Sequence, residues 1–490
     1  MLRKLSNALF GSRSRKGNEE DSRTSENPKQ MNTQLSQSPS IAEIKDELEL
    51  ESATVIERNS HNISRKNISS NALKVLYRLN QAGYQAFLVG GSVRDLLLQG
   101  TPKDFDVSTD ATPEEIKQLF RNSRIIGRRF KIVHIRYGRE IIEATTFRAH
   151  HRPRNEFDDG VTSRAFSSLD SAHSSSGMIL RDNVYGGIVE DALRRDFSIN
   201  ALYYTTRSFL LIDFADGIKD IKDRRIRIMG DPALRYKEDP VRMLRAIRFA
   251  AKLNFTIEES TRKPLDHLAH LLESIAPARL FDESIKLLVG GKAEDTFNLL
   301  KQFKISSILF KGTMESLADC DENSARLLTL ALQNTDKRLA AGKSITPAFL
   351  YAALLWGPLQ RELDNTAENQ KITIPDLHSA ANTVISDQVK ITAIPRRFTI
   401  AMREIWELQL RLPRRNKRNV ESVYKHPRFR AAYDFLLLRE EAGENLDGLG
   451  QWWTEFQNSD KNHQQDLLHS VPHKRPGRRR SRSKNSGSNE

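Results

Sequence analysis

The spacing of hydrophobic residues changes repeatedly between residues 71 and 148. Residues 71–83 place apolar side chains three to four positions apart, which predicts an amphipathic helix that ends at a glycine. The apolar run 85–89 predicts a short strand, and residues 90–100 begin with two glycines and continue as a short helix. Residues 103–109 predict a second strand. Strands and helices that alternate over so short a distance indicate a compact α/β unit.

The next residues extend this unit by one helix and two strands. Thr112, Pro113 and Glu115 mark the start of the helix as N-cap, first helical residue and capping-box acid. Residues 132–138 and 139–148 alternate apolar and polar positions, which predicts a pair of neighbouring strands.

Two segments lack this periodicity. Residues 1–60 consist mainly of Ser, Asn, Gln and charged residues, a composition that cannot offset the entropy of ordering, so we expect disorder there. Residues 151–177 are polar and Ser-rich, and we interpret them as a flexible insertion within the domain. After about residue 232 almost every periodic segment is helical, which predicts an all-helical body behind the α/β domain.

The composition adds a positive charge to this picture. The 490 residues include 77 Lys and Arg against 63 Asp and Glu, which gives a formal net charge of +14. This balance indicates a polyanionic partner, either nucleic acid or an anionic membrane surface, or else a solvated basic surface. The tail from His473 onwards carries seven Lys or Arg and one acid, and it is too polar to fold alone. A phosphate-binding arm and a solvated tail both remain open for it.

Cysteine content and hydropathy limit the compartment. Cys320 is the single cysteine, which excludes an internal disulfide framework and a thiolate metal cluster and fits a reducing compartment. No apolar run approaches the roughly 20 residues that a membrane span needs. We therefore expect a cytoplasmic protein without stable membrane insertion.

Asp104 and Asp106 stand one residue apart in the second predicted strand. Side chains at i and i+2 share one face of a strand, so the two carboxylates lie together while Phe105 and Val107 point into the core. Carboxylates this close repel each other unless cations separate them, and Mg²⁺ takes hard oxygen ligands of this kind. Two such metals serve an in-line displacement at phosphorus. A surface strand with salt bridges is the alternative.

Neighbouring residues favour the phosphate interpretation. Gly90 and Gly91, just upstream, allow a phosphate to approach the backbone closely, and Arg94 adds a positive charge. Glu143 lies on a strand that we expect to neighbour the first, where it would be a third metal ligand. Asp196 directly follows two arginines, and an internal ion pair that fixes a turn is the alternative to a catalytic role for it.

Four motifs together carry a family resemblance. "LVGGSVRD", "DFDVST", "RRDFSIN" and "EDPVRMLRAIRF" resemble, in order and spacing, the class II template-independent nucleotidyltransferases. That family comprises the CCA-adding tRNA nucleotidyltransferases and the bacterial poly(A) polymerases. The resemblance runs from about residue 61 to beyond residue 450. It implies an α+β nucleotidyltransferase head of the polymerase beta-like kind with a small mixed sheet, followed by an all-helical neck, body and leg.

The resemblance also implies domain limits and site residues. The expected domains are a disordered segment 1–60, a catalytic head 61–225, a helical neck 226–290 with a nucleotide-recognition helix, a helical body and RNA-binding leg 291–470, and a basic disordered tail 471–490. Asp104 and Asp106 would hold catalytic Mg²⁺ or Mn²⁺, and Asp196 would belong to the active-site acids. The residues expected at the nucleotide are Gly90, Gly91, Arg94, Arg195, Asp239, Arg242, Arg245 and Arg248.

One pair in that set has a chemical logic. Adenine presents a donor at N6 and an acceptor at N1, and a carboxylate beside a guanidinium, as in Asp239 and Arg242, matches that edge. Cytosine also presents a donor beside an acceptor, so the pair does not by itself separate ATP from CTP.

The stretch "IIGRRFKIVH", residues 125–134, resembles the signature of the bacterial poly(A) polymerases, although its apolar residues are also typical of strand core. Residues 406–418 and 424–439 resemble the same subfamily. We expect Trp452 and Trp453 to be core residues rather than stacking platforms for bases. The side chains expected to contact RNA are those of Arg128, Arg129, Lys131, Arg414, Arg415, Arg478, Arg479 and Arg480.

These observations lead to one expected activity and two alternatives. We expect a polynucleotide adenylyltransferase that adds AMP from ATP to RNA 3′-OH ends in mRNA processing and turnover, releasing pyrophosphate by a two-metal mechanism. Its expected partners are RNA 3′ ends, ATP and the RNA-degradation machinery, and we expect a monomer. CCA addition to tRNA and an inactive RNA-binding protein are the alternatives. The presence of Asp104, Asp106 and Asp196 argues against the inactive protein.

Overall fold

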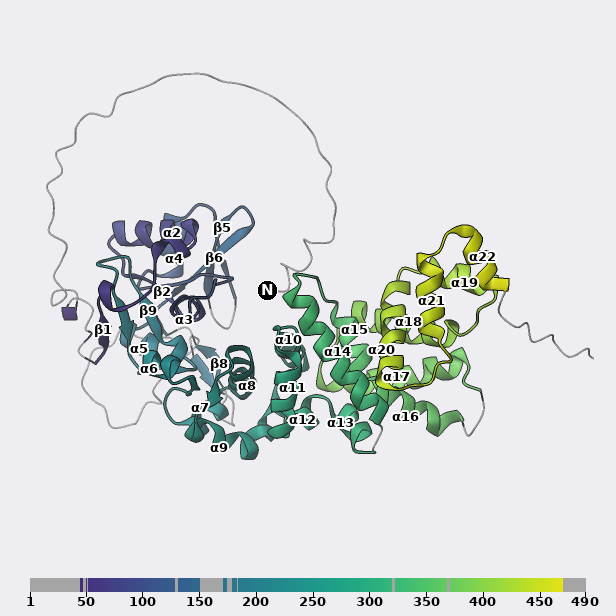
Figure 1. The fold of residues 1–490 in the computed structure, drawn as a ribbon. Helices are drawn as coiled ribbons and strands as arrows, with labels where there is room; N and C mark the ends of the chain where they lie inside the picture. The colour runs from purple at the N-terminus through teal and green to yellow at the C-terminus, as the bar shows by residue number, and fades with distance from the viewer. Residues whose placement is uncertain are drawn as a thin grey trace, which may run out of the picture. The chain divides into compact units, whose positions relative to one another are not determined.

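The computed structural model describes residues 45–46, 50, 52–127, 131–149, 171–173, 179–182, 184–319, 322–367 and 371–469 (Figure 1). Several predictions fall outside these residues: those for the first 44 residues, for most of the insertion and for the basic tail. The proposed RNA contacts that fall outside them are Arg128, Arg129, Arg478, Arg479 and Arg480.

An eight-stranded mixed sheet forms the first half of the described chain. Its strand order is β1-β10-β9-β2-β3-β6-β5-β4. The strands are β1 Thr54–Ile56, β2 Ala86–Val89, β3 Asp106–Thr109, β4 Ser123–Ile126, β5 Ile132–Tyr137, β6 Glu140–Thr146, β9 Leu202–Tyr204 and β10 Leu211–Asp213. Only β3 and β6 pair in parallel within this sheet, and the other neighbours are antiparallel. This arrangement confirms the predicted head with a small mixed sheet.

Helices cover both faces of the sheet (Figure 1). They are α2 Ser70–Gln81, α3 Gly91–Leu97, α4 Pro113–Leu119, α5 Ile188–Leu193 and α6 Gly217–Lys222. Ala86 and Leu88 of β2 belong to one core with α2 and α4, whereas Phe87 and Val89 belong to a second core with α5. A strand buried on both faces carries a continuous apolar run, which is why residues 85–89 do not alternate.

Capping residues are present at the starts of α2 and α4 in this head domain. The capping box of Thr112 and Glu115 is present, with Pro113 in the first turn of α4. The hydroxyl of Ser69 accepts hydrogen bonds from the first backbone N–H groups of α2, and Val75 on the apolar face of that helix is fully buried. Local caps of this kind are set by neighbouring residues, so the sequence predicted them correctly.

Three sequence predictions need correction here. Disorder up to residue 60 is wrong for the last part of that segment, because β1 pairs with β10 and Leu50 is 1% exposed in the core. The second predicted strand is shorter than expected and begins at Asp106 rather than residue 103. The predicted insertion also contains a strand, β7 Ser171–His173, which pairs with β8 Ile179–Asp182. Short strands like these take their stability from a partner strand, which local periodicity does not reveal.

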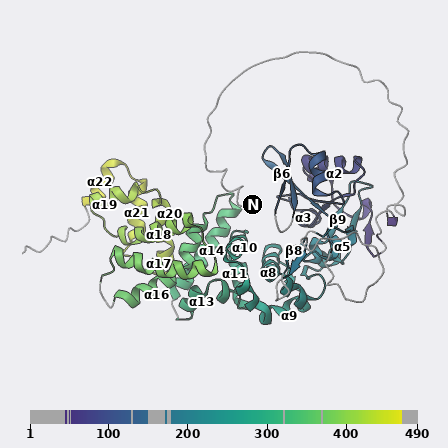
Figure 2. The ribbon, with the colours of Figure 1, turned by 180° about the vertical axis from the view of Figure 1, so that it is seen from behind.

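A small parallel pair, β11 Arg225–Ile226 and β12 Thr256–Ile257, begins the helical region. Three helices accompany it: α7 Pro232–Glu238, α8 Val241–Leu253 and α9 Glu259–Leu268. The further helices are α10 Pro277–Leu288, α11 Ala293–Gln302, α12 Ser306–Leu309, α13 Lys311–Ala318, α14 Glu322–Ala340, α15 Pro347–Leu354, α16 Trp356–Ala367, α17 Ile374–Ile391, α18 Arg396–Arg411, α19 Lys417–Tyr424, α20 Phe429–Ala442, α21 Leu449–Asn458 and α22 Lys461–His469. Figures 1 and 2 show these helices packing on one another, as the helical periodicity predicted.

The last helices enclose a separate aromatic core. Trp453 is fully buried and Trp452 is 8% exposed, among side chains from α18 to α21. The two indole rings meet edge to face with centroids 5.0 Å apart. This confirms the prediction that both tryptophans are core residues. Among the described residues, no helix is long and apolar enough to cross a bilayer.

Candidate active site

The acid pair lies where β3 begins. Asp106 is the first residue of the strand and Asp104 precedes it, and both side chains are half-buried. Phe105 is 8% exposed and Val107 is fully buried, so the alternation expected from the sequence is present. The carboxylates therefore stand on the accessible side of a segment whose other side is anchored in the core.

Glu143 lies directly beside this pair. The parallel register of β3 and β6 places it opposite Asp106, which confirms the expected neighbouring strand. Its carboxylate also lies 3.4 Å from the Nε2 atom of His134 on β5. In the part of the chain that the structure describes, no group of three or more His, Cys, Asp or Glu side chains has metal-binding geometry. Glu143 as a third metal ligand therefore stays a prediction.

The predicted phosphate-binding turn at Gly90 and Gly91, called the glycine turn below, follows β2. Strand β2 pairs with β3 on the side away from β6. Val89, the last residue of β2, is opposite Asp106 in the antiparallel register. The turn that starts at Gly90 therefore lies immediately beside the acid pair. Gly90 has φ 71° and ψ −134°, a backbone conformation that favours glycine because a Cβ would be strained there. The sheet thus brings the predicted phosphate-binding turn and the predicted metal ligands to one place.

Two arginines flank this turn. A Cβ atom built on Gly90 would lie 3.4 Å from Nη1 of Arg195, and one on Gly91 would lie 3.4 Å from Nη2 of Arg94. The Arg94 side chain is 3% exposed and donates to Asp95 at 2.7 Å and to Asn200 at 2.7 Å. Both guanidinium groups are therefore held close to the backbone of the turn.

Asp191 is a residue of this region that the sequence interpretation missed. It is 7% exposed and accepts hydrogen bonds from Arg195 at 3.1 Å and from the Tyr203 hydroxyl at 2.6 Å. Burial alone would raise the pKa of Asp191, but the charge of Arg195 and the Tyr203 hydrogen bond outweigh it and hold the pKa below its usual value. The sequence signal was its position one helical turn before Arg195, at i and i+4.

Asp196 binds an arginine of α8. Its carboxylate forms an ion pair with Arg245 of α8 and accepts a hydrogen bond from Asn200 at 3.2 Å. Burial raises the pKa of this carboxyl, but the charge of Arg245 and the hydrogen bonds from Asn200 and Arg245 outweigh burial and lower it overall. The internal ion pair considered from sequence is present, with Arg245 as its partner. Asp196 as a catalytic acid stays a prediction.

The other predicted nucleotide contacts lie at the junction of α7 and α8. Asp239 accepts a hydrogen bond from Arg279 of α10 at 2.7 Å. Arg242 donates to Glu238 at 2.7 Å, so each of the two residues predicted to read the base edge has a partner of its own on the chain. Sequence reasoning missed Arg279 and Glu238, because nothing in their local pattern separates them from ordinary charged helix residues.

Three guanidinium groups pack against the ring of Phe249. The Cζ atoms of Arg94, Arg245 and Arg248 lie 5.1, 5.2 and 4.8 Å from its ring centroid. The Nε atom of Arg248 is buried and has no hydrogen-bond partner among the described residues. Burial and the nearby charge of Arg245 lower the pKa of Arg248 to about 10. The structure thus concentrates positive charge between the glycine turn and α8.

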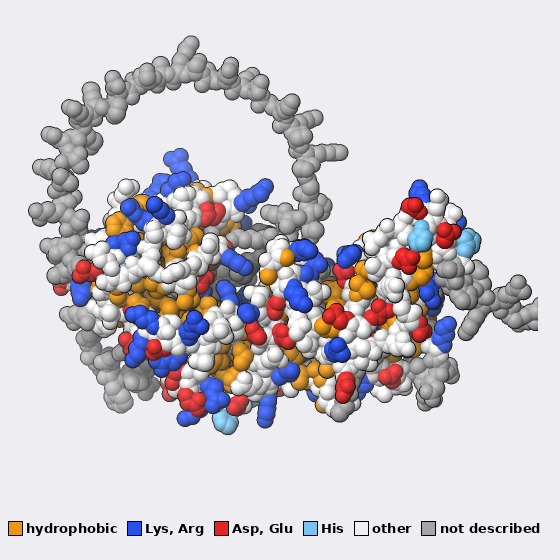
Figure 3. All heavy atoms as spheres, in the orientation of Figure 1, with side chains coloured by type: hydrophobic (Ala, Val, Ile, Leu, Met, Phe, Trp, Pro, Cys, Tyr) orange, Lys and Arg blue, Asp and Glu red, His pale blue; other side chains and the backbone are white. Residues whose placement is uncertain are grey.

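The predicted RNA contacts that the structure describes lie at the surface. Lys131 is exposed beside Glu114, with 3.5 Å between Nζ and the carboxylate. Arg414 is exposed, and Arg415 lies over the ring of Trp452 at 5.8 Å. On the face shown in Figure 3, Lys and Arg side chains are scattered among acidic ones.

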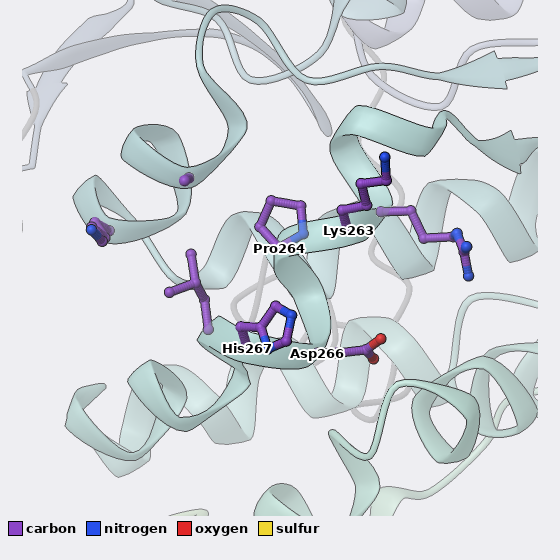
Figure 4. A pocket seen from close by; sticks show the side chains of 8 residues that line it. Lys263, Pro264, Asp266 and His267 are labelled. Carbon is purple, nitrogen blue, oxygen red and sulfur yellow. The ribbon is translucent and has the colours of Figure 1, made fainter.

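A separate groove of about 500 Å³ lies between α7 and α9 (Figure 4). Lys237, Arg262, Lys263 and His267 line it together with Asp266. It contains none of the residues predicted from the sequence for metal, nucleotide or RNA, so its position does not change the assignment of the acid pair and the glycine turn.

Three protein-family models match successive parts of the chain. Residues 86–227 match the "Poly A polymerase head domain", and residues 254–317 match the "Probable RNA and SrmB- binding site of polymerase A". Residues 369–486 match the "Polymerase A arginine-rich C-terminus". The first range contains the acid pair, the glycine turn and Asp191.

Full-length relatives cover most of the chain. Poly(A) polymerase I of Escherichia coli O6:H1 is 47% identical over 433 residues, which are 88% of this chain and 91% of that protein. Poly(A) polymerase I of Haemophilus influenzae is 42% identical over 440 residues, 87% of this chain and 95% of that protein. The CCA-adding enzyme of Lactobacillus helveticus is 36% identical over 254 residues, only 50% of this chain.

Solved structures agree with the fold. A CCA-adding enzyme in an apo form superposes with a TM-score of 0.54 at 19% identity, covering 86% of this chain and 91% of that one. The Thermotoga maritima CCA-adding enzyme, complexed with tRNA, gives a TM-score of 0.52 at 18% identity, with the same coverage of 86% and 91%. At such low identity these similarities show the shared fold of head and helical region.

Proposed function

This chain belongs to the poly(A) polymerase I family, and from that premise we propose that it adds AMP from ATP to RNA 3′-OH ends without a template. The observation that carries the proposal is the register of β2 and β3, which sets Val89 opposite Asp106 and so starts the Gly90 turn beside the acid pair. A phosphate held at the turn lies next to carboxylates able to share cations with it.

The donor set fits divalent cations. Asp104 and Asp106 offer hard carboxylate oxygens from one accessible side of the chain, as Mg²⁺ or Mn²⁺ requires, and substrate phosphates would complete the coordination. Bound there, two such ions would lower the pKa of the attacking hydroxyl and offset charge on the phosphates. Glu143, opposite Asp106, is the proposed further acid.

The chain's own residues hold the reactants in place. In the proposed reaction the RNA 3′-oxygen attacks the α-phosphorus of ATP, loses its proton, and displaces pyrophosphate by breaking the bond to the bridging oxygen. Gly90 and Gly91 let the triphosphate approach the backbone, and the guanidinium of Arg195 lies against Gly90 to receive its charge. Fixed charges of this kind stabilise a phosphoryl-transfer transition state without reorganisation.

Base recognition is proposed for the junction of α7 and α8. Asp239 can accept from the adenine N6 amino group while Arg279 holds its other side, and Arg242 can donate to N1. Arg245 is anchored by Asp196, which fixes α8 relative to the loop that carries Arg195. We propose that Arg248 contributes positive charge at the phosphate side of α8.

Substrate and partners are proposals from the family. We propose RNA 3′ ends as acceptors, with Lys131, Arg414 and Arg415 as phosphate contacts, because exposed Lys and Arg contact RNA phosphates regardless of sequence. We also propose that the protein acts as a monomer in the cytoplasm. Its role there would be in mRNA processing and turnover, alongside the RNA-degradation machinery.

The test uses the whole chain with one unstructured RNA and each nucleoside triphosphate separately, in Mg²⁺ and in Mn²⁺. We expect long tails with ATP and little product with CTP, GTP or UTP. The second candidate, CCA addition, is favoured by the CCA-adding relatives that share about half of this chain. A reaction that stops after CCA on a trimmed tRNA, with no tails from ATP alone, would show that candidate to be right.

A further inference from the structure

Asp191 is a buried carboxylate that the proposed reaction does not use directly. It lies on α5 and accepts four hydrogen bonds. The donors are the Tyr203 hydroxyl at 2.6 Å, Nη2 of Arg195 at 3.1 Å, the Ser108 hydroxyl at 3.1 Å and the backbone N–H of Arg148 at 3.2 Å. A carboxylate with this many donors in a buried position is held in one orientation.

The donors tie Asp191 to the acid pair and the glycine turn. Ser108 is two residues after Asp106 on β3, so both side chains lie on the same face of the sheet. Tyr203 of β9 is opposite Val89 in the antiparallel register, and Val89 in turn is opposite Asp106. Asp191 thus sits behind the residues that would hold metal and triphosphate.

Among the described residues, the side-chain partners of Arg195 lie along one edge of its guanidinium. Its Nε donates to the Tyr203 hydroxyl at 2.7 Å, its Nη2 donates to Asp191, and its Cζ lies 4.8 Å from the centroid of the Tyr203 ring. The opposite edge, with Nη1, lies against Gly90. Tyr203 also donates to Asp191, so the three side chains form a closed triangle of hydrogen bonds.

A buried ion pair by itself is weak evidence for anything beyond folding, because the cost of desolvation offsets most of the attraction. The triangle differs from a plain ion pair because it binds one particular edge of the Arg195 guanidinium. It uses the edge of the guanidinium that faces the sheet and leaves the other edge towards the turn, where an anion would need two parallel donors.

We propose that Asp191 and Tyr203 are positioning residues that hold the guanidinium of Arg195 against the Gly90 turn so that it binds a phosphate of the incoming nucleotide. This inference rests on the proposed function, since it assigns the triphosphate to that turn. It gives roles to two residues that touch neither substrate nor metal, and it makes their effect depend on Arg195.

The first test is the steady-state kinetics of Asp191→Asn and Tyr203→Phe in the full chain. Each keeps the shape of its side chain and removes one anchor of Arg195. We expect the KM for ATP to rise about 10-fold, which is the size expected for losing a charged hydrogen bond. The KM for RNA is expected to stay within about 2-fold of wild type, because Arg195 faces the nucleotide.

A matched control comes from a second buried triad. Asp220 is 4% exposed and accepts from Ser198 at 2.6 Å and from Nε of Arg227 at 2.8 Å, and neither donor belongs to the glycine turn. Asp220→Asn should lower the unfolding temperature as Asp191→Asn does while leaving the KM for ATP unchanged. An equal rise in KM for both variants would overturn the positioning role.

The decisive test is a double-mutant cycle on ATP affinity, measured by calorimetry without RNA. In an Arg195→Ala background, adding Asp191→Asn should change the affinity by less than about 2-fold, because the residue through which it acts is gone. Independent effects that multiply would refute the proposal. If Asp191→Asn does not fold, the same cycle with Tyr203→Phe decides.

The outcomes separate this inference from the proposed function. A wild-type chain that adds no adenylate to RNA refutes the proposed function. A wild-type chain that does add adenylate, together with variants of unchanged ATP affinity, refutes the positioning role alone.

Discussion

Two groups of acids in the head domain differ in how they are arranged. Asp104 and Asp106 are neighbours in the chain, half-buried, and stand where a strand begins. Asp191 and Asp196 are farther apart in the chain and each is bound to an arginine, and Asp191 is 7% exposed. Burying a carboxylate is costly unless a cation or several donors accompany it. The second group has its cations on the chain itself, and the first is the group that we propose to hold cations from solution.

Removing either carboxylate of the first group, Asp104 or Asp106, is expected to have the largest effect on the rate of adenylate addition. Asp104→Ala and Asp106→Ala should each lower the rate of adenylate addition about 10³-fold or more, since loss of a metal ligand removes several kcal/mol of transition-state stabilisation. Stability should hardly change, because both side chains are half-buried. The rate is measured by tail synthesis on a labelled RNA. Glu114→Ala, an exposed acid on α4, is the control that should act like wild type.

Breaking the Asp196–Arg245 pair of the second group should mainly affect stability. Asp196→Asn leaves the Arg245 guanidinium without its counter-charge, and we expect a loss of about 3 to 5 kcal/mol in the free energy of unfolding. Urea denaturation followed by tryptophan fluorescence and circular dichroism measures this. The exposed pair of Asp387 and Lys390, at 2.7 Å, is the comparison. Asp387→Asn should cost no more than about 1 kcal/mol, and equal losses would remove the distinction.

Asp239 is an intermediate case, because it is partly exposed and has one arginine partner, Arg279. Asp239→Asn replaces one acceptor by a donor, so we expect kcat/KM for ATP to fall about 10-fold to 100-fold. The ratio of ATP to CTP use, measured by competition, should fall with it. Asp266→Asn in the groove between α7 and α9 is the control. An unchanged ratio for Asp239→Asn would argue against base recognition at this residue.

Acid should remove the stabilisation that Asp196 contributes to the fold. The pKa of Asp196 is lowered in the folded chain, so its contribution is present above the unfolded pKa of about 3.9 and is lost as pH falls through the folded pKa. Urea denaturation at a series of pH values down to about pH 3 should show a shallower decline for Asp196→Asn than for wild type. Parallel curves would contradict this.

Surface arginines should give the smallest effect. Arg414→Ala should weaken RNA binding a few-fold and reduce the slope of log affinity against log salt by about 1. Filter binding at several salt concentrations measures it. Arg361→Ala, another exposed arginine paired with Asp319, should leave the slope unchanged. The same reduction in both variants would mean that Arg414 has no specific contact.

Features decided by neighbouring residues were predictable from the sequence. The capping box at Thr112, the glycine turn after residues 85–89 and the alternation around Asp106 depend on dihedral preferences and on spacing. The helical region from residue 232 follows from its periodicity in the same way. The four motifs and their order then led to the family, which the relatives confirm.

Contacts between distant segments could not be predicted in this way. Strand β1 was missed because a three-residue strand has no periodicity of its own and exists through pairing with β10. The partner of Asp239 is Arg279 of α10, forty residues along the chain, and no local pattern around Asp239 indicates that contact. Asp191 and Tyr203 meet Arg195 only because α5 lies against the sheet.

The sequence by itself determined that the two acids would share one face of a strand and that a glycine turn would end the strand before it, since local backbone geometry fixes such features. The pairing of β2 with β3 then brought the turn beside the acids. Only the tertiary structure decided which arginine neutralises which buried acid. An ion pair forms where packing brings two elements together, and packing depends on the whole core rather than on the residues that form the pair.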